Sequence, residues 1–111
     1  MNAEQIDSPA SASPLVLAAR LGALSHPTRL EILRYLAERQ CCCKDVVGQL
    51  DLAQSTVSQH LKVLVDAGLV QLTTERQRSL YRIDRAVLAE TSRSVAGIVA
   101  ACCAGGDDGC V

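Results

Sequence analysis

The stretch from residue 53 to residue 70, AQSTVSQHLKVLVDAGLV, constrains the fold of this chain most strongly. Val57, Leu61 and Leu64 recur at i, i+4 and i+7, so they share one narrow face of a helix. Gly68 tolerates the left-handed conformation in which helices often end, and it predicts the stop of this helix. The face opposite the apolar stripe carries Ser55, Gln59 and Lys62. The stretch therefore predicts an amphipathic helix whose outer face can form hydrogen bonds to base edges and phosphates.

A short helical segment precedes this helix at residues 44–50, and the connection through residues 51–53 is tight. Two helices joined so closely meet at a large angle, as in the helix-turn-helix that places its second helix in a DNA major groove. A polar face alone is equally typical of a solvated surface helix, and the neighbouring segment favours DNA. The side chains of this helix that we expect to contact DNA are Gln54, Ser55, Thr56, Ser58, Gln59, His60 and Lys62.

Length and composition limit the kinds of protein that this chain can be. A chain of 111 residues, 49% of them hydrophobic, fits one domain with a modest core. It has no Phe or Trp, so it lacks the aromatic platforms that stack single-stranded bases, and double-stranded DNA is the expected partner. No run approaches the roughly 18–20 apolar residues of a membrane span, and the N-terminus lacks a signal-peptide pattern. We therefore expect a cytoplasmic protein without membrane contact.

Charge is unevenly distributed along the chain. The formal net charge is −1, but all 11 Lys and Arg lie between Arg20 and Arg93, where only eight acidic residues occur, so this segment carries +3. The other acidic residues lie near the two ends. So weakly basic a segment predicts only moderate, salt-sensitive DNA affinity from charge. We expect base recognition and dimer formation to supply the remaining binding free energy.

Two more helices are expected before the helix-turn-helix. Residues 1–13 are rich in Ser, Ala and Pro, and we expect them to form a flexible tail. A helix begins at Pro14, and Ser25-His26-Pro27 separates it from a second helix at residues 29–39, because proline fits the first helical turn. His26 is expected at the helix entry rather than as a metal ligand. The residues expected to face inward are Leu17, Leu21, Leu24, Leu30, Leu33 and Leu36.

A β-hairpin is expected after the helix-turn-helix. Residues 70–74 and 79–83 have strand character on either side of the segment Glu75-Arg76-Gln77-Arg78. A two-stranded wing can place Arg76 and Arg78 against phosphates or in a neighbouring minor groove. Arginine at a loop tip is also often merely solvated, and we slightly favour DNA contact.

The last helix is expected to run from Arg85 to about Ala101, because the side chain of Asp84 can cap its start. Small residues on it would let another helix approach closely: Ala96, Gly97 and Ala100. The expected organisation is a flexible tail at residues 1–13, one DNA-binding and dimerisation domain at residues 14–101, and a cysteine-containing tail at residues 102–111.

Three motifs, in this order, resemble the ArsR/SmtB family of metal-sensing transcriptional repressors: LGALSHPTRLEILRYL, STVSQHLKVLVDAGLV and RQRSLYRID. The resemblance covers about residues 15–100. It implies a mainly α-helical winged helix-turn-helix with a small β-hairpin, and a homodimer paired through its first and last helices. It also implies a repressor that leaves its operator when an effector binds. Where the family often places a capping Ser this chain has Ala53, and loss of such a cap costs about 1 kcal/mol.

Six cysteines form two clusters, Cys41-Cys42-Cys43 and the trio of Cys102, Cys103 and Cys110. Three adjacent cysteines do not readily pair with one another, and no signal peptide is evident, so we expect reduced thiols. Neither cluster has the His, Asp and Ser neighbours of an activated nucleophile. The sequence therefore predicts no enzyme.

The inducer is argued from these thiols. Soft, thiolate-rich sites select thiophilic ions, and zinc normally takes four tetrahedral ligands. Three thiolates without His suit a trigonal pyramidal ion, which in the resembling family points to trivalent arsenic or antimony. The zinc-type site of that family needs His and carboxylates on the last helix, and residues 85–101 contain no His. We therefore expect As(III), or Sb(III), as the inducer and no organic cofactor.

The C-terminal trio of Cys102, Cys103 and Cys110 is the first choice for this ion. It resembles a CC-x6-C arrangement of some arsenic-responsive members, and the intervening AGGDDG can fold the third thiolate back. Against the family's other pattern, Cys-x-Cys-Asp, Cys42 matches the first cysteine but Lys44 occupies the second. The second or supplementary site is Cys41, Cys42 and Cys43, whose adjacent side chains diverge. The alternatives are incidental thiols in a disordered tail, and burial of a thiol of the first cluster as a small apolar group.

Binding of the ion is expected to order the tail and shift the dimer helices. The two recognition helices would then lose their spacing on successive major grooves. A thiol-based redox or reactive-sulfur sensor of the same fold is the alternative function, because it would use the same cysteines and respond through disulfide formation.

Overall fold

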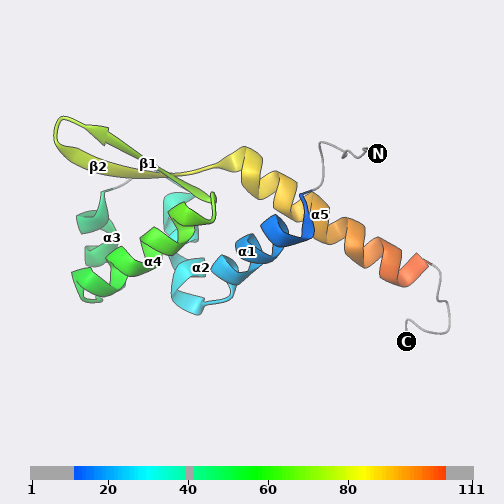
Figure 1. Ribbon diagram of the computed structural model, residues 1–111. Coiled ribbons are helices and arrows are strands. Elements are labelled where there is room, and N and C mark those ends of the chain that lie inside the picture. The colour runs from blue at the N-terminus through cyan, green and yellow to red at the C-terminus, as the bar shows by residue number, and fades with distance from the viewer. Residues whose placement is uncertain (1–11, 40–41, 105–111) are drawn as a thin grey trace.

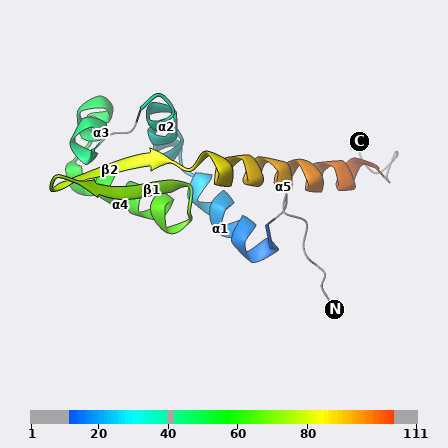
Figure 2. The same ribbon diagram turned by 90° about the horizontal axis from the view of Figure 1, so that it is seen from above.

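Five helices and one β-hairpin make up residues 12–39 and 42–104, the part of the chain that the computed structural model describes (Figure 1). The elements are α1 (Pro14–Leu24), α2 (Pro27–Leu36), α3 (Cys43–Leu50), α4 (Gln54–Asp66), β1 (Val70–Glu75), β2 (Arg78–Ile83) and α5 (Arg85–Ala104). Figures 1 and 2 show α3, α4 and the hairpin together at one end, while α5 runs out to the other. This is the winged helix-turn-helix that the sequence predicts.

Proline and a polar cap define the start of each of the first two helices. Ser13 accepts a hydrogen bond from the Val16 N–H at 3.2 Å, and Pro14 follows it. His26 caps α2 in the same way, because its Nδ1 accepts from the Thr28 N–H at 3.1 Å. The helix-entry position of His26 is thus confirmed. Helix α2 spans residues 27–36 and not 29–39.

The apolar stripe of α4 is the centre of the core. Val57, Leu61 and Leu64 are each 0% exposed, and α2, α3 and the hairpin pack around them. The buried residues of this core are Ala23, Ile32, Leu33, Leu36, Val46, Val57, Leu61, Leu64, Leu69, Val70 and Ile83. The inward face of α4 is therefore the face that the periodicity predicts.

Two residues expected to face inward are instead on the surface. Leu33 and Leu36 are buried as predicted, but Leu30 is 46% exposed, and Ile32 takes its place in the buried face of α2. Leu21 is 39% exposed, and it lines an apolar groove between α1 and α5. The surface between these two helices is thus more apolar than the sequence pattern predicts.

The helix-turn-helix is formed by α3 and α4 around a three-residue turn. Asp51 ends α3 in the left-handed region, with a φ of 58°, and α4 begins after Ala53. Ala53 provides no side-chain hydrogen bond to the first turn of α4. Gly68, with a φ of 86°, ends the helix as predicted and turns the chain into β1.

The hairpin is tighter than the sequence predicts. The strands pair antiparallel from Val70 with Ile83 to Glu75 with Arg78, so only Arg76 and Gln77 form the turn. Both have positive φ angles, 51° and 68°, which suits the right-handed twist of a two-residue hairpin. Arg76 therefore lies at the tip, while Arg78 belongs to β2.

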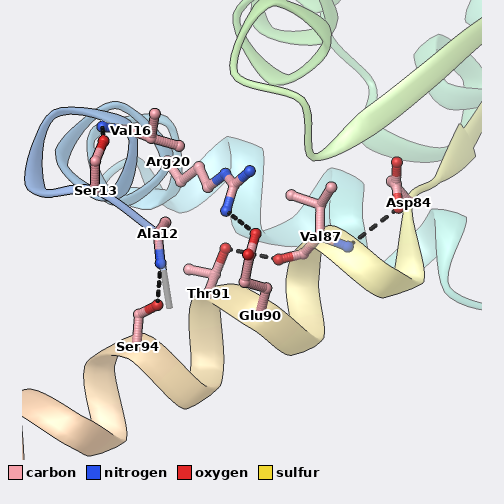
Figure 3. Close-up of polar contacts among 9 residues, drawn as sticks. All are labelled: Ala12, Ser13, Val16, Arg20, Asp84, Val87, Glu90, Thr91 and Ser94. Carbon is pink, nitrogen blue, oxygen red and sulfur yellow. Dashed lines mark hydrogen bonds and ion pairs between the residues drawn. The ribbon is translucent and has the colours of Figure 1, made fainter. Parts of the chain in front are cut away.

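Helix α5 is tied to α1 by polar contacts on its inner face (Figure 3). Arg20 Nη1 lies 2.7 Å from Glu90 Oε1, and the Ala12 N–H donates to Ser94 Oγ at 3.1 Å. Asp84 caps the start of α5 as predicted, accepting from the Val87 N–H at 3.1 Å. The helix ends at Ala104, beyond the expected end near residue 101. Cys102 and Cys103 therefore belong to α5 and not to a tail.

By length and composition alone, α5 is apolar enough to cross a membrane, contrary to the expectation that no run of the chain approaches a membrane span. It has 20 residues, a mean hydropathy of 1.3, and only 11% of its apolar window buried. Core helices of soluble proteins pass the same test but are mostly buried, whereas α5 is mostly exposed in the single chain and is joined to α1 by the ion pair of Arg20 with Glu90. Ile98 and Val99, both about half exposed, leave an apolar face that a protein partner can cover.

The uncapped start of α4 gives a first prediction. Ala53→Ser should raise the free energy of unfolding by about 1 kcal/mol, because a serine hydroxyl at this extended position can accept from the first-turn N–H groups. Urea unfolding followed by circular dichroism measures the change. Ala53→Val, which adds no acceptor, is the control and should give no gain; equal stabilisation by both variants would contradict the capping argument.

Candidate functional site

The outer face of α4 is a continuous polar surface. Ser55, Gln59 and Lys62 lie half a turn from the buried stripe and are exposed. Ser58 borders this face on the side of α3, with its Oγ 3.9 Å from Cys43 Sγ. The structure thus places most of the predicted DNA contacts on one accessible helix face, at the second helix of a helix-turn-helix.

The start of α4 adds backbone donors to this surface. Gln54 and Thr56 are exposed in its first turn, where Ala53 supplies no side-chain acceptor. Free N–H groups and the positive end of the helix dipole favour an anion at such a position. A phosphate of a bound duplex fits this requirement.

Lys62 is held by an ion pair along the helix. Its Nζ lies 2.9 Å from Asp66 Oδ2, and both side chains are mostly exposed. Exposed pairs of this kind contribute little to stability, so Lys62 can exchange the carboxylate for a phosphate at small cost. The exchange would leave Asp66 close to the bound nucleic acid and limit the net gain.

His60 differs from the other predicted contacts because it is half-buried and has defined partners. Its Nδ1 lies 3.3 Å from Arg29 Nη1, and its ring centroid lies 4.5 Å from that of His26. Burial lowers the pKa of His60 below its ordinary value, and the charges of His26 and Arg29 lower it further. Sequence reasoning did not single out Arg29, because a contact between residues 31 positions apart leaves no local pattern.

The hairpin presents its two arginines at the same end of the molecule. Arg76 and Arg78 are exposed at the turn and at the start of β2. Figures 1 and 2 both show the hairpin tip at the end that holds α3, opposite the end of α5. The wing can therefore reach a duplex that lies against α4.

Cys42 and Cys43 point in different directions, as expected for neighbouring residues. Cys42 is the residue before α3, and its N–H and its thiol both donate to Asp45 Oδ2 in the first turn of the helix, each at 3.3 Å. Cys43 faces α4 and the hairpin; burial raises the pKa of Tyr81 on β2, and the nearby Cys43 raises it further. Both thiols are half-buried. Cys41 lies outside the described residues.

Cys102 and Cys103 are exposed in the last turn of α5. The end of α5 lies opposite α3 in both views, so Cys102 and Cys103 are far from Cys42 and Cys43 of the same chain (Figures 1 and 2). Cys110 lies outside the described residues. Within residues 12–39 and 42–104, no three His, Cys, Asp or Glu side chains form a group that can hold a metal ion.

The comparisons with known proteins agree with this geometry. Residues 26–71 match the sequence profile described as bacterial regulatory protein, arsR family. Over 72 residues the chain is 35% identical to the arsenical resistance operon repressor of Staphylococcus xylosus, covering 65% of this chain and 69% of that repressor. The chain belongs to the arsR family.

Other members of the arsR family are similar over different lengths. The HTH-type transcriptional repressor SmtB of Mycobacterium tuberculosis is 41% identical over 63 residues, which are 57% of this chain but only 47% of SmtB. The chain thus spans about half the length of that relative. An ArsR-like transcriptional regulator from Rhodococcus sp. RHA1 superposes with a TM-score of 0.72 at 30% identity, covering 78% of this chain and 81% of that structure.

The contact between Cys42 and Asp45 gives a second prediction. Asp45→Ala should lower the free energy of unfolding by about 1 kcal/mol, because the N–H and thiol of Cys42 lose their acceptor at the start of α3. Asp45→Asn keeps an acceptor oxygen and should lose less. Equal losses in urea unfolding of the two variants would show that the contact does not stabilise α3.

Proposed function

We propose that this protein is a homodimeric transcriptional repressor that binds double-stranded operator DNA in the cytoplasm. The observation that carries the proposal is the outer face of α4. There Ser55, Gln59 and Lys62 are exposed on the second helix of a helix-turn-helix whose other face is fully buried. Membership of the arsR family and the basic hairpin beside α4 support it.

Dimer formation is proposed through α1 and α5. Leu17, Leu21, Gly97 and Ile98 line an apolar groove between these helices. Leu15 on α1 and Val99 on α5 are also exposed, at 86% and 54%. A second copy would cover this apolar surface and place two recognition helices on successive major grooves, roughly 34 Å apart.

The DNA proposal predicts different effects at two positions of α4. Lys62→Ala should weaken binding to all duplexes and reduce the salt dependence of log K by about one, because a phosphate contact is lost. Gln59→Ala should instead relax base preference and cost about 1–3 kcal/mol on the operator. Fluorescence anisotropy on promoter DNA at several salt concentrations measures both.

Arg34→Ala is the matched control for the charge. Arg34 is exposed on α2 and lines a hollow with Arg85 and Leu88, away from the outer face of α4. Its loss removes the same charge as Lys62→Ala but no proposed contact. If Arg34→Ala weakened binding as much as Lys62→Ala, net charge and not the α4 face would explain the affinity.

The inducer is proposed to be trivalent arsenic, or antimony, bound by cysteine thiolates. The C-terminal trio of Cys102, Cys103 and Cys110 is the first choice, with Cys41, Cys42 and Cys43 as a second site. The arsenical resistance operon repressor of Staphylococcus xylosus, as a relative, supports a thiophilic ion. Exposure of Cys102 and Cys103 also supports the choice, because an ion can reach them without disturbing the core.

The three thiolates of the C-terminal trio can bind one ion together only if the last turn of α5 unwinds. Neighbouring helical residues point about 100° apart, so Cys102 and Cys103 must leave regular helix geometry to share a ligand. Such a change would occur on the helix proposed to form the dimer. A coupling of about 1–3 kcal/mol between ion and DNA would reduce DNA affinity roughly 5- to 150-fold.

Arsenite titration tests the inducer site. The triple serine variant at Cys102, Cys103 and Cys110 should bind promoter DNA like the wild type but resist release by arsenite, because it lacks the coupled thiolates. The triple serine variant at residues 41–43 is the matched control and should still release. Release of the C-terminal variant at wild-type arsenite concentrations would assign the response to the other cluster.

A thiol-based redox or reactive-sulfur sensor is the second candidate function. Its support is that Cys102 and Cys103 are both exposed, which favours attack by oxidants or persulfides. Mild oxidant followed by non-reducing electrophoresis separates the two candidates. Release of DNA with disulfide formation, and no release by arsenite under reducing conditions, would favour this second function.

A further inference from the structure

Arg29 connects three helices through one guanidinium group. Its Nε donates to the Ala23 carbonyl at 2.7 Å and its Nη2 to the Gly22 carbonyl at 3.4 Å, both at the end of α1. The remaining nitrogen, Nη1, lies 3.3 Å from His60 Nδ1 on the recognition helix α4. Anchored by α1, the guanidinium is held in place for this third contact.

The contact determines the tautomer of His60. A guanidinium can only donate hydrogen bonds, so His60 Nδ1 must accept, and the proton of the neutral ring is on Nε2. Burial disfavours a positive His60 ring most, and His26 from the turn before α2 and Arg29 from α2 disfavour it further. His26 is itself fixed, because its Nδ1 accepts from the Thr28 N–H. His60 is thus a neutral donor around pH 7.

His60 borders a hollow on the surface of α4. The other residues that line it are Ser55, Thr56 and Gln59. All three are exposed; Ser55 and Thr56 each carry a hydroxyl that can donate a hydrogen bond to a phosphate oxygen, while Gln59 remains available for a base edge. A non-bridging phosphate oxygen accepts several such donors at once, and neutral donors commonly fix the register of a protein on the DNA backbone.

We propose that Arg29 is a positioning residue for DNA binding, which orients His60 to donate from Nε2 to a phosphate oxygen of the duplex held in this hollow. The inference rests on the proposed function, since it requires DNA on the α4 face. It adds Arg29, which makes no DNA contact of its own, to the residues on which DNA affinity depends. It also assigns His60 to the phosphate backbone and not to a base.

Substitution of His60 tests the donor in a chain that keeps Arg29. His60→Leu removes both ring nitrogens and should raise the Kd for promoter DNA about fivefold to tenfold, as expected for one lost hydrogen bond. The salt dependence should stay unchanged, because no charge is lost. His60→Gln keeps an acceptor and a donor and should stay within about twofold of the wild type. Equal Kd values for wild type and His60→Leu would overturn the proposal.

Arg29→Met separates positioning from a merely structural role. Without the guanidinium one of the three causes that lower the pKa of His60 is removed, so the pKa should rise part of the way towards its ordinary value and DNA binding should begin to strengthen at a higher pH than in the wild type. The wild type should show this change only at lower pH. The same titration of His60→Leu corrects for His26 and all other groups. A pH profile of Arg29→Met identical to that of the wild type would contradict the proposal.

Nuclear magnetic resonance of the DNA-free protein distinguishes failure of this inference from failure of the proposed function. Long-range proton–nitrogen correlation on the full chain should show His60 protonated at Nε2 in the wild type and mixed tautomers in Arg29→Met. A wild-type His60 protonated at Nδ1 overturns the inference, whatever the protein binds. Absence of duplex binding by the wild type overturns the proposed function and this inference together, whereas tight binding that ignores His60 overturns the inference alone.

Discussion

The rotational position of α4 is the constraint on which the rest of the structure depends. Val57, Leu61 and Leu64 are all fully buried, and burying each aliphatic side chain contributes about 1.5–3 kcal/mol. Turning the helix by a quarter would expose this stripe and bury polar groups in its place. The outer face of Ser55 and Gln59 is therefore oriented by the core beneath it and needs no contacts of its own.

The sequence predicts those features that depend on neighbours along the chain. The period of the α4 stripe, the stop at Gly68 and the cap at Asp84 are local, and all three are confirmed. The contact of Arg29 with His60 was not predicted because only packing of α2 against α4 brings the two together. The hairpin turn was predicted too long because the propensities of Glu75 and Arg78 do not reveal that they pair across the strands.

The polar contact between α1 and α5 fixes the orientation of the two helices more than it adds to the free energy of unfolding. The ion pair of Arg20 with Glu90 is largely buried, and Arg20 Nε has no hydrogen-bond acceptor among residues 12–39 and 42–104 of one chain. A buried donor without a partner costs free energy, so the net contribution of such a pair is small. What the pair provides is a defined angle between the helices that carry the apolar groove.

In the proposed repressor, DNA affinity depends on the spacing of the two recognition helices in the dimer, because each helix alone makes only weak contacts with DNA. The segment from Arg20 to Arg93 carries a formal charge of only +3, and Lys62 is paired with Asp66, so one recognition helix alone would bind DNA weakly. Two linked helices bind far more tightly, but only while their spacing matches the duplex. A change at the end of α5 that altered this spacing would remove the gain from the second helix. In the proposed mechanism, modest affinity per helix would make a small rearrangement at Cys102 and Cys103 sufficient for release.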